Sequence, residues 1–271
     1  MSGSERATER IHGIHAVQAL LERHPQRVQR LRVSAARQDA RIAKLLALAA
    51  KAGCPVERVD AHQLAKQAGA GHQGVVAEVS PQAPWSEEQL FTALAGVDRP
   101  VLLALDGVQD PHNLGACLRT ADACGALALI VPRDRAAQLT PTVRKVAAGA
   151  AETTPVVAVT NLARCLRLLK EAGLWVVGAD GGATLEADGV DLTLPLVLVM
   201  GAEGAGLRQL TRQHCDVLVR LPRLGAVESL NVSVAAGMLL YEAVRQRRGA
   251  QAAAAGLAAL GSAGADATAS C

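Results

Sequence analysis

Three groups of polar residues follow apolar, strand-like segments of this sequence and carry side chains that could do chemistry. Asn113 and Arg119 come after the first segment, Glu203 after the second, and Ser229 and Asn231 after the third. Amides and hydroxyls donate or accept hydrogen bonds, a carboxylate accepts them, and a guanidinium presents a fixed fork of donors suited to phosphate. If the three segments converge, this set can position a substrate and assist a proton or group transfer.

Taken singly, each group also has an ordinary structural explanation. Arg119 could face solvent and pair with Asp122, and Ser229 could cap the helix that we expect to begin near it. His112 is expected to be a turn residue rather than a base. Asn231 is harder to explain in this way, because an amide in the first turn of an otherwise apolar helix needs a hydrogen-bonding partner.

The second segment is rich in glycine. GAEGAG (201–206) directly follows a strand-like run, and glycine there lets the backbone pass close to a ligand. Its spacing is not the GxGxxG of a dinucleotide site, and the sequence contains no P-loop. The missing fingerprint argues against a dehydrogenase that uses a nicotinamide cofactor.

Composition excludes several classes of protein. Half of the residues are hydrophobic, but only Trp85, Phe91, Trp175 and Tyr241 are aromatic, which excludes a platform that stacks bases on a row of rings. No apolar stretch approaches the ~20 residues that cross a bilayer. Six scattered cysteines lack zinc-ligand spacing, so we expect reduced, buried thiols and no metal. The sequence predicts a soluble cytoplasmic protein without a membrane partner.

Charge is divided unevenly along the chain. Residues 1–80 carry twelve Lys and Arg against seven Asp and Glu, whereas residues 81–271 carry sixteen against eighteen. A basic N-terminal part suggests contact with a polyanion such as RNA, because phosphate neutralisation supplies most nonspecific nucleic-acid affinity. A solvated basic surface without a partner is the alternative.

Hydrophobic periodicity divides the chain into a small α/β unit, a linker and a larger α/β unit. Residues 15–23 and 40–52 have helical apolar spacing, and 28–33, 55–59 and 74–79 read as short strands. Ser86 and Gln89 resemble a capping box for one helix in the linker. From Val101, continuous apolar strands alternate with helices, which predicts a parallel sheet buried on both faces.

Together, the three segments resemble the ordered motifs of one known enzyme family. They are NLGACLRTADACGA (113–126), LVMGAEGAGL (198–207) and LPRLGAVESLNVSVAAG (221–237). On these motifs the chain is similar to the SpoU, or TrmH-type, RNA 2'-O-ribose methyltransferases of the SPOUT superfamily. The leading IHGIHAVQALLE and HQGVVAEV resemble the substrate-binding domain of its bacterial 23S rRNA guanosine methyltransferases, so the resemblance covers about residues 10–248.

The resemblance implies an α/β fold and a domain order. We expect a flexible start (1–9), a small RNA substrate-binding domain (10–80), a linker with a short helix (81–98), a SPOUT catalytic domain (99–248) and an Ala- and Gly-rich disordered tail (249–271). In the family the catalytic domain has a parallel sheet and a deep trefoil knot, contrary to the rule that chains do not thread themselves. Family members are homodimers with the active site at the subunit interface, so the apolar last helix is a candidate interface element.

The same resemblance implies a cofactor and site residues. In the family, S-adenosylmethionine lies in the knot against the second and third motif loops, without a metal. By position we expect cofactor contacts from Met200, Gly201, Ala202, Glu203, Leu221, Leu230 and Val232, and catalytic roles for Asn113, Arg119, Glu203, Ser229 and Asn231. The Arg is often assigned as general base in the family. A guanidinium stays protonated in proteins, however, so Arg119 is better suited to hold the target phosphate and stabilise a developing alkoxide.

The leading functional hypothesis is methylation of a guanosine ribose 2'-hydroxyl in 23S rRNA. The alternatives are a tRNA or rRNA adenosine target, and a noncatalytic RNA-binding relative that keeps the fold. Two positions depart from the usual motif: Arg223 stands where Met is common, and Ala226 where Ser is common. Neither belongs to the five polar positions, so they bear on substrate choice more than on activity.

Overall fold

The basic N-terminal part of the chain forms a four-stranded sheet. In the computed structural model, which describes residues 8–81, 83–227 and 229–267, the strand order is β1-β4-β2-β3. Only β2 and β3 run parallel among the neighbouring pairs. The strands are β1 (Glu9–His12), β2 (Val28–Ser34), β3 (Val56–Val59) and β4 (Val75–Val79). The three strands predicted in this region are confirmed within a residue or so, and β1 was not predicted.

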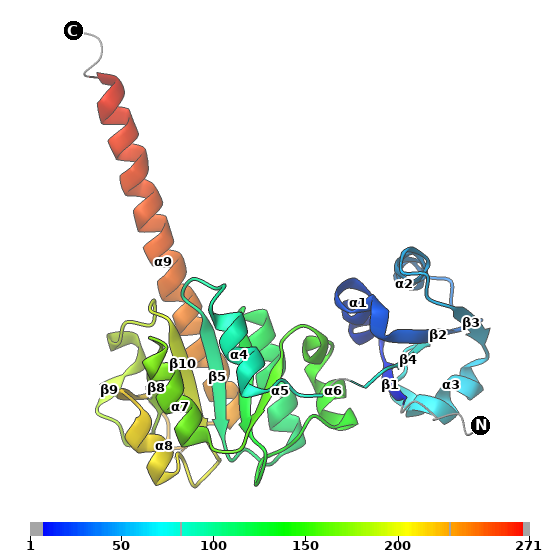
Figure 1. Ribbon diagram of the computed structural model, residues 1–271, viewed down its shortest axis with the longest axis horizontal. Coiled ribbons are helices and arrows are strands. Elements are labelled where there is room, and N and C mark those ends of the chain that lie inside the picture. The colour runs from blue at the N-terminus through cyan, green and yellow to red at the C-terminus, as the bar shows by residue number, and fades with distance from the viewer. Residues whose placement is uncertain (1–7, 82, 228, 268–271) are drawn as a thin grey trace.

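Helices cover both faces of this small sheet (Figure 1). The elements are α1 (Ile14–Arg23), α2 (Ala40–Lys51), α3 (Ala61–Ala68) and the short 3-10 turns η1 (Pro25–Arg27) and η2 (Gly69–Gly71). Leu20 of α1 and Leu45 of α2 are fully buried against Leu31 of β2. On the other face, Leu64 of α3 packs on Val76. The helical apolar spacing of α1 and α2 therefore corresponds to a real buried face.

The linker packs against the second sheet. Its helix α4 (Glu87–Leu94) begins with the predicted capping box, in which Ser86 accepts from the backbone N–H of Gln89 and the Gln89 side chain accepts from the backbone N–H of Ser86. Leu90 of this helix is fully buried. The backbone N–H of Trp85 donates to the carbonyl of Val156 at 2.8 Å. These contacts tie the linker to the larger domain.

The second sheet confirms the predicted parallel arrangement. Its order is β7-β6-β5-β10-β8-β11-β9, and every neighbouring pair is parallel. The strands are β5 (Val101–Asp106), β6 (Ala128–Pro132), β7 (Val156–Val159), β8 (Trp175–Ala179), β9 (Leu185–Glu186), β10 (Leu196–Gly201) and β11 (Val217–Arg220). β10 lies between β5 and β8, so the chain's second motif enters the middle of the sheet.

Alternate strand residues face two helical layers. The remaining elements are α5 (Pro111–Ala123), α6 (Pro141–Ala147), α7 (Leu162–Glu171), α8 (Gln209–His214), α9 (Val232–Ala267), η3 (Ala150–Glu152) and η4 (Ala187–Gly189). Leu103 and Leu105 of β5 lie in one apolar cluster with α5, α6 and α9, while Leu102 and Ala104 lie in another with α4 and α7. α6 lies very close to α5, since a Cβ on Gly115 would be 2.7 Å from Val146 Cβ.

The last helix, α9, projects beyond the body of the domain (Figure 1). It begins at Val232 and continues to Ala267, so it extends past Gly249, where we expected a disordered tail to start. Alanine has the highest helix propensity, which accounts for a helix through this Ala-rich stretch. The end of that expected tail (268–271) and most of the expected flexible start (1–7) lie outside the described residues.

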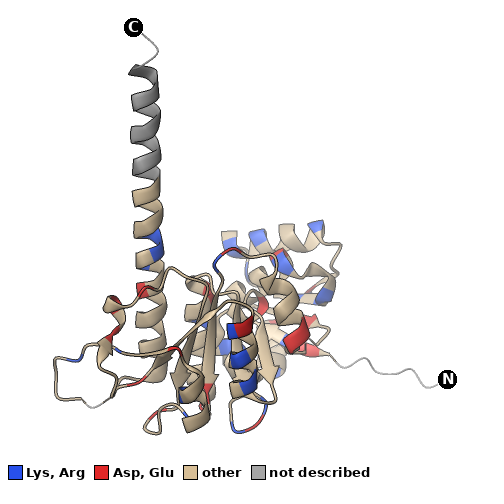
Figure 2. Cartoon of the chain, turned by 60° about the vertical axis from the view of Figure 1, so that its left-hand side comes forward, with Lys and Arg blue, Asp and Glu red and all other residues tan. Residues whose placement is uncertain are grey.

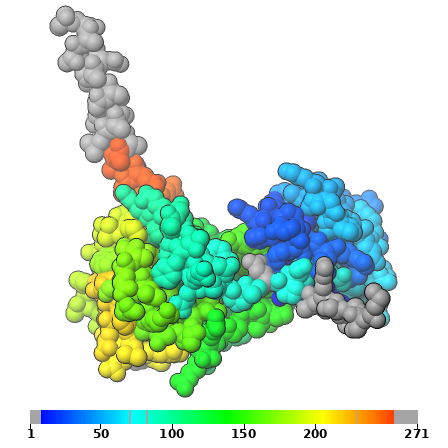
Figure 3. Space-filling model, in the orientation of Figure 1, coloured from blue at the N-terminus to red at the C-terminus, as the bar shows by residue number. Residues whose placement is uncertain are grey.

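A buried ion-pair network joins the two domains, which lie side by side in Figure 3. Glu152 of η3 is 2.5 Å from Arg27 of η1 and 2.6 Å from Arg144 of α6. Arg144 is also 3.1 Å from Glu9 of β1. The Glu152 side chain is only 2% exposed, so this carboxylate depends on its arginine partners. The network links η1 and β1 of the small domain to α6 and η3 of the large one.

Candidate active site

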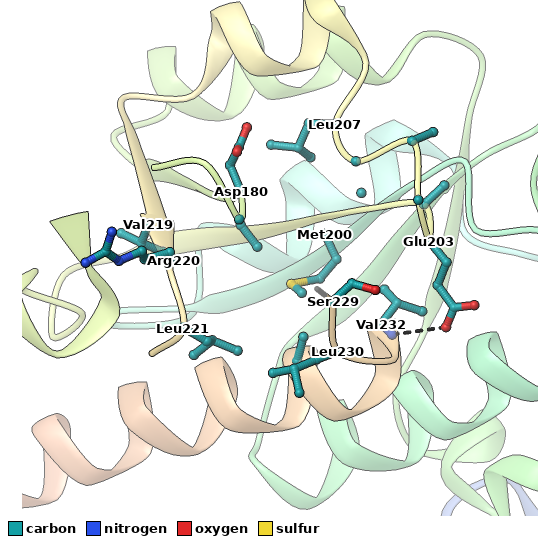
Figure 4. A pocket seen from close by; sticks show the side chains of 18 of the residues that line it. Asp180, Met200, Glu203, Leu207, Val219, Arg220, Leu221, Ser229, Leu230 and Val232 are labelled. Atoms are coloured by element: carbon teal, nitrogen blue, oxygen red, sulfur yellow. Dashed lines mark hydrogen bonds between the residues drawn. The ribbon is translucent and has the colours of Figure 1, made fainter. Parts of the chain in front are cut away.

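A cavity of about 400 Å³ opens where the carboxyl ends of β8, β10 and β11 approach the start of α9 (Figure 4). Ligand sites in open parallel sheets are expected at this edge. All seven residues predicted for cofactor contact line the cavity: Met200, Gly201, Ala202, Glu203, Leu221, Leu230 and Val232. Ser229 also lines it, whereas Asn113, Arg119 and Asn231 are not among its lining residues. The second and third motifs therefore form its walls.

The glycine-rich loop forms a tight turn along one wall. Ala202 and Gly206 exchange two backbone hydrogen bonds, of 3.1 and 2.9 Å. A Cβ on Gly201 would lie 2.1 Å from the carbonyl carbon of Gly206, so only glycine fits there. Gly204 and Gly206 have φ values of +75° and +64°, a region that other residues rarely adopt. The turn thus brings its backbone close to the cavity, while the side chain of Glu203 lies at the rim.

A buried carboxylate anchors the far end of this loop. Asp106, the last residue of β5, pairs in register with Gly201 of β10. Its side chain is fully buried, and Oδ2 accepts from the backbone N–H of Arg208 at 2.8 Å. Arg208 Nε lies 3.5 Å from Oδ1. Asp106 therefore ties the end of the first motif's strand to the segment that follows the glycine loop.

Three polar residues from the three motifs meet beside the cavity. Glu203 Oε1 accepts from Asn231 Nδ2 at 2.7 Å, from Asn113 Nδ2 at 3.3 Å and from the backbone N–H of Val232 at 3.3 Å. Asn231 Nδ2 also donates to Asn113 Oδ1 at 2.9 Å. Asn113 is 9% exposed, while Glu203 is exposed to solvent. This cluster brings together three loops that are distant in the chain.

Asn231, and not Ser229, caps the last helix. The helix begins at Val232, three residues later than the predicted start near Ser229. Asn231 Oδ1 accepts from the backbone N–H groups of Ser233 and Val234, at 2.9 and 3.4 Å. The capping explanation of Ser229 is therefore wrong, and the amide that needed a partner has several. Ser229 is instead an exposed residue on the cavity wall (Figure 4).

Arg119 lies apart from the other four predicted catalytic residues. It is exposed on α5 and makes no hydrogen bond or ion pair with any residue that the structure describes. The simple pairing with Asp122 is wrong, because Asp122 Oδ1 instead accepts from the hydroxyls of Thr153 and Thr154. Asp110 caps this helix by accepting from the backbone N–H of His112 at 3.0 Å, so His112 lies in the first turn of α5 and is exposed.

The loop after β8 also lines the cavity and was not predicted from the sequence. Asp180 accepts from the backbone N–H of Gly182 at 2.8 Å and forms an ion pair with Arg212 of α8. Arg223 donates to the carbonyl of Gly181 at 3.2 Å, so it bridges two loops at the cavity mouth. The sequence signal that could have identified this loop is Asp-Gly-Gly directly after a buried strand. Loops that follow parallel strands lie at the ligand-binding edge of the sheet.

The site combines apolar walls, exposed loop backbone and carboxylates. Met200, Leu221 and Leu230 supply apolar surface, and Glu203 and Asp180 supply negative charge at the rim. Glu203 Oε2 makes no hydrogen bond within the described part of the chain, so it is available to a ligand. Three arginines also line the cavity, among them Arg212, which pairs with Asp180, so the site suits a partly apolar ligand that carries both positive and negative groups.

Within 8–81, 83–227 and 229–267, no three His, Cys, Asp or Glu side chains gather in a way that could hold a metal ion. Over the same residues, no helix has the length and apolar character needed to span a membrane.

Two family profiles match the chain, one over each sheet. The profile of the SpoU rRNA Methylase family matches residues 100–241. The profile described as RNA 2'-O ribose methyltransferase substrate binding matches residues 10–85. The two matches together include all three motifs, the cavity and the basic N-terminal part.

Relatives and solved structures agree with these profiles. The 23S rRNA (guanosine-2'-O-)-methyltransferase RlmB of Pseudomonas putida is 58% identical over 241 residues, which cover 89% of this chain and 97% of that protein. The protein of the same name from Escherichia coli is 52% identical, with coverages of 89% and 99%. The structure of the SpoU methyltransferase AviRb from Streptomyces viridochromogenes in complex with AdoMet matches with a TM-score of 0.74 at 25% identity, covering 91% and 95%.

Proposed function

The chain belongs to the SpoU rRNA methylase family, and from that premise we propose that it transfers a methyl group from S-adenosylmethionine to the ribose 2'-hydroxyl of a guanosine in 23S rRNA. The observation that carries the proposal is the meeting of Asn113, Glu203 and Asn231 beside the cavity. High identity to the RlmB proteins over nearly their whole length supports the rRNA guanosine as target. An enzyme that modifies rRNA would act in the cytoplasm.

The cavity fits the cofactor. Its volume lies within the range of about 300 to 1,000 Å³ that is typical of small-molecule sites. The glycine turn at 201–206 allows close approach of a ligand to backbone, Leu221 and Leu230 can cover an adenosyl group, and Glu203 can face a positive charge. When bound, S-adenosylmethionine supplies an electrophilic methyl group on a sulfonium.

Each polar residue has a proposed role in alignment. Asn113 and Asn231 fix the Glu203 carboxylate, so that its second oxygen can hold the ribose or the charged end of the cofactor. Ser229, on the cavity wall, is positioned to hydrogen bond the target nucleotide. Alignment of reacting groups at about 3 to 3.5 Å can supply much of the rate enhancement in such a transfer. Arg119 would hold the target phosphate and stabilise the developing alkoxide.

We propose further that the protein works as a homodimer through α9. Val234, Met238 and Tyr241 form an exposed apolar stripe on this helix, with exposed fractions of 51%, 41% and 65%. The stripe lies on the helix that packs against α5 next to Arg119, since a Cβ on Gly237 would lie 3.4 Å from Thr120 Cγ2. A partner packed on the stripe would place Arg119 at the interface. Arg119 would then serve the cavity of the opposite subunit.

We also propose that the catalytic domain contains a trefoil knot. In the large sheet, β10 lies between β5 and β8, and β11 lies on the other side of β8. After β11 the chain returns, so that Asn231 lies beside Glu203 and α9 packs against α5. This return of the last segment to the second motif supports the proposed threading. Limited proteolysis followed by refolding tests the knot, because a threaded chain is expected to refold slowly.

Two measurements test the reaction. Calorimetry should detect binding of S-adenosylmethionine to the wild-type protein, which a noncatalytic RNA-binding relative would lack. Mapping of ribose methylation in a strain without this gene should show one guanosine of 23S rRNA losing its methyl group. Loss at a tRNA site or at an rRNA adenosine would replace the proposed substrate.

Arg119 provides the sharpest test of the site. We expect Arg119→Ala to abolish methyl transfer with nearly unchanged cofactor affinity, and Arg119→Lys to restore little activity because the fork of donors is lost. Mixing inactive Arg119→Ala with inactive Glu203→Ala should recover activity in heterodimers, since one of their two sites would be intact. Failure of the mixture to recover would place Arg119 in its own subunit's site.

A further inference from the structure

Three cationic or potentially cationic side chains gather on the seam between the two domains, outside the cavity. They are His12 at the end of β1, His72 after η2, and Lys145 in the last turn of α6. A Cβ on Gly71 would lie 3.3 Å from Lys145 Nζ and 3.8 Å from His12 Nε2, so the two domains contribute to one cluster. Lys145 is exposed and both histidines are partly exposed. A ligand from solvent can therefore reach all three.

The cluster lacks a negative partner. Lys145 makes no hydrogen bond or ion pair with any residue in the described ranges. Burial lowers the pKa of His12 below its usual value, and the neighbouring side chains of Lys145 and His72 lower it further. At neutral pH this imidazole is therefore uncharged, and an anion beside it would favour the protonated form.

Carboxylates on the surrounding elements do not neutralise the cluster. The other ionisable groups on the elements that pack against β1, and on β1 itself, are Glu9, Arg10, His15, Glu22, Arg23, His62, Lys66, Glu78 and Arg144. Each acid in this set is ion-paired elsewhere: Glu9 with Arg144, Glu22 with Lys44, and Glu78 with Arg32. The seam thus presents net positive charge.

The histidine geometry leaves a donor free for an anion. His72 Nδ1 accepts a hydrogen bond from the backbone N–H of Gly74 at 2.9 Å. A neutral imidazole that accepts at Nδ1 carries its proton on Nε2, which is therefore a donor. His72 Nε2 and the ammonium of Lys145 are the donor types that bind phosphate oxygens.

We propose that His12, His72 and Lys145 form a phosphate-binding subsite for the RNA backbone, and that the subsite exists only while the two domains are docked. The inference rests on the proposed function, which supplies the RNA. The network around Glu152 holds α6 and β1 together, and so keeps Lys145 beside His12. Figure 2 marks Lys and Arg positions in blue along helices of the small domain, so the subsite would lie beside other basic residues of that domain.

The seam is also close to the polar cluster of the site. α6 packs against α5 at Gly115, two residues from Asn113. A strand of RNA held at Lys145 would therefore be anchored one helix away from the reacting centre. Such an anchor gives the small domain a role in placing the target nucleotide, beyond nonspecific attraction.

Histidine ring resonances of the full-length protein, recorded by NMR over a pH series, test the subsite. Addition of a 23S rRNA transcript should raise the pKa of His12 by about one unit, since a phosphate would stabilise its protonated form. Inorganic phosphate alone should produce a smaller shift if the RNA backbone is the true ligand. Equal shifts with both probes would reassign the seam to free phosphate.

Variants at one exposed position extend the test. Lys145→Ala should weaken binding of the transcript about threefold to tenfold and lower the slope of log affinity against log salt by about one. Lys145→Arg should retain wild-type binding, because it keeps the charge.

Lys51→Ala is the matched control: Lys51 ends α2 and leads to β3, at the opposite edge of the sheet from β1. It should leave the His12 titration unchanged.

The outcomes separate this inference from the proposed function. If Lys145→Ala binds the transcript as the wild type does, or if RNA leaves the His12 titration unmoved, the seam is not a phosphate subsite. Both results are compatible with full methylation of 23S rRNA. Conversely, RNA could shift the His12 titration in a protein that shows no methyltransferase activity. That result would contradict the proposed reaction and support the phosphate subsite.

Discussion

Asn231 Nδ2 lies 2.7 Å from Glu203 Oε1, and this hydrogen bond joins the third motif to the second across 28 residues of chain. The same carboxylate oxygen accepts from Asn113, which adds the first motif. Hydrogen bonds to a charged acceptor are stronger than neutral ones. Glu203 is therefore the residue on which the relative placement of all three loops depends.

Asn231→Asp should disrupt this arrangement. The substitution places a second carboxylate where an amide donates to Glu203, and it removes a charge-assisted hydrogen bond that contributes about 1.5 to 3 kcal/mol. Solvent exposure of Glu203 puts the cost at the lower end of that range. Methyl transfer should fall about tenfold or more, because 1.4 kcal/mol of lost alignment is a factor of ten. Single-turnover kinetics of both proteins would measure this loss of methyl-transfer rate.

Ser233→Ala is the control for that variant. Among the described residues, the Ser233 hydroxyl donates to Asn231 Oδ1 alone, so loss of this hydroxyl keeps the amide of Asn231 beside Glu203. We expect nearly wild-type rates. If the two variants lost activity equally, the helix cap and not the carboxylate would explain the effect.

Gly201→Ala should damage the cofactor site specifically. A methyl group there would lie 2.1 Å from the Gly206 carbonyl carbon, so the turn must open. Affinity for S-adenosylmethionine, measured by calorimetry, should fall by about tenfold or more, which corresponds to 1.4 kcal/mol. Affinity for an rRNA transcript should be unchanged. Gly189→Ala, where a Cβ meets nothing within 4 Å, should leave cofactor binding intact.

The parts of the fold with strong apolar periodicity could be predicted from the sequence, and the short elements could not. Strands such as Val101–Asp106 are long apolar runs, which are typical of a sheet covered on both faces. The four-residue strand Val156–Val159 and the seven-residue helix Pro141–Ala147 are too short for a periodic signal, and both were missed.

The site was predictable only where a motif marks it. Gly201 and Glu203 belong to a recognisable loop, and both line the cavity. Asp180 carries no such mark: its loop reaches the cavity because β8 lies beside β10, a neighbour relation that sequence order does not reveal. Arg119 illustrates a different limit, because a single chain leaves it outside the cavity.

Removal of the charge at Glu152 should loosen the docking of the two domains. Glu152→Gln leaves Arg27 and Arg144 facing a neutral amide, and loss of one partner from a buried ion pair costs about 3 to 5 kcal/mol. The midpoint of denaturant unfolding should fall, and chymotrypsin should cut the linker faster at Trp85 or Phe91. Glu57→Gln, in a pair where Glu57 is 46% exposed, should cost less than about 1 kcal/mol. Equal midpoints for the two variants would contradict the prediction.

Three thiols with strongly raised pKa values should resist alkylation in the folded protein: Cys117 and Cys165 are buried, and Cys215 is partly exposed. Burial raises the pKa of Cys117, Cys165 and Cys215 to about 12, so at pH 8 they are protonated and unreactive. Mass spectrometry after iodoacetamide treatment should find them labelled only in denaturant, whereas the less buried Cys124 should react first. Labelling of Cys117 in the native protein would contradict this.

The same shifts predict how stability depends on alkaline pH. In the unfolded chain these thiols ionise near their ordinary value of 9.0, while in the folded protein they stay protonated until about pH 12. The unfolded state therefore gains from ionisation above pH 9, and the free energy of unfolding should fall between pH 9 and 12. Denaturant titrations at pH 8 and 10 measure the change.

The pairing of β10 with β5 has a consequence for how the protein is made. Val101 lies opposite Leu196, so the middle of the large sheet closes only after a long intervening stretch has left the ribosome. Contacts between residues so distant in the chain form slowly. Asn231 comes later still, which means that a nascent chain has no working site until nearly all of its sequence has been translated. A premature stop anywhere before α9 would release a fragment unable to complete its own centre.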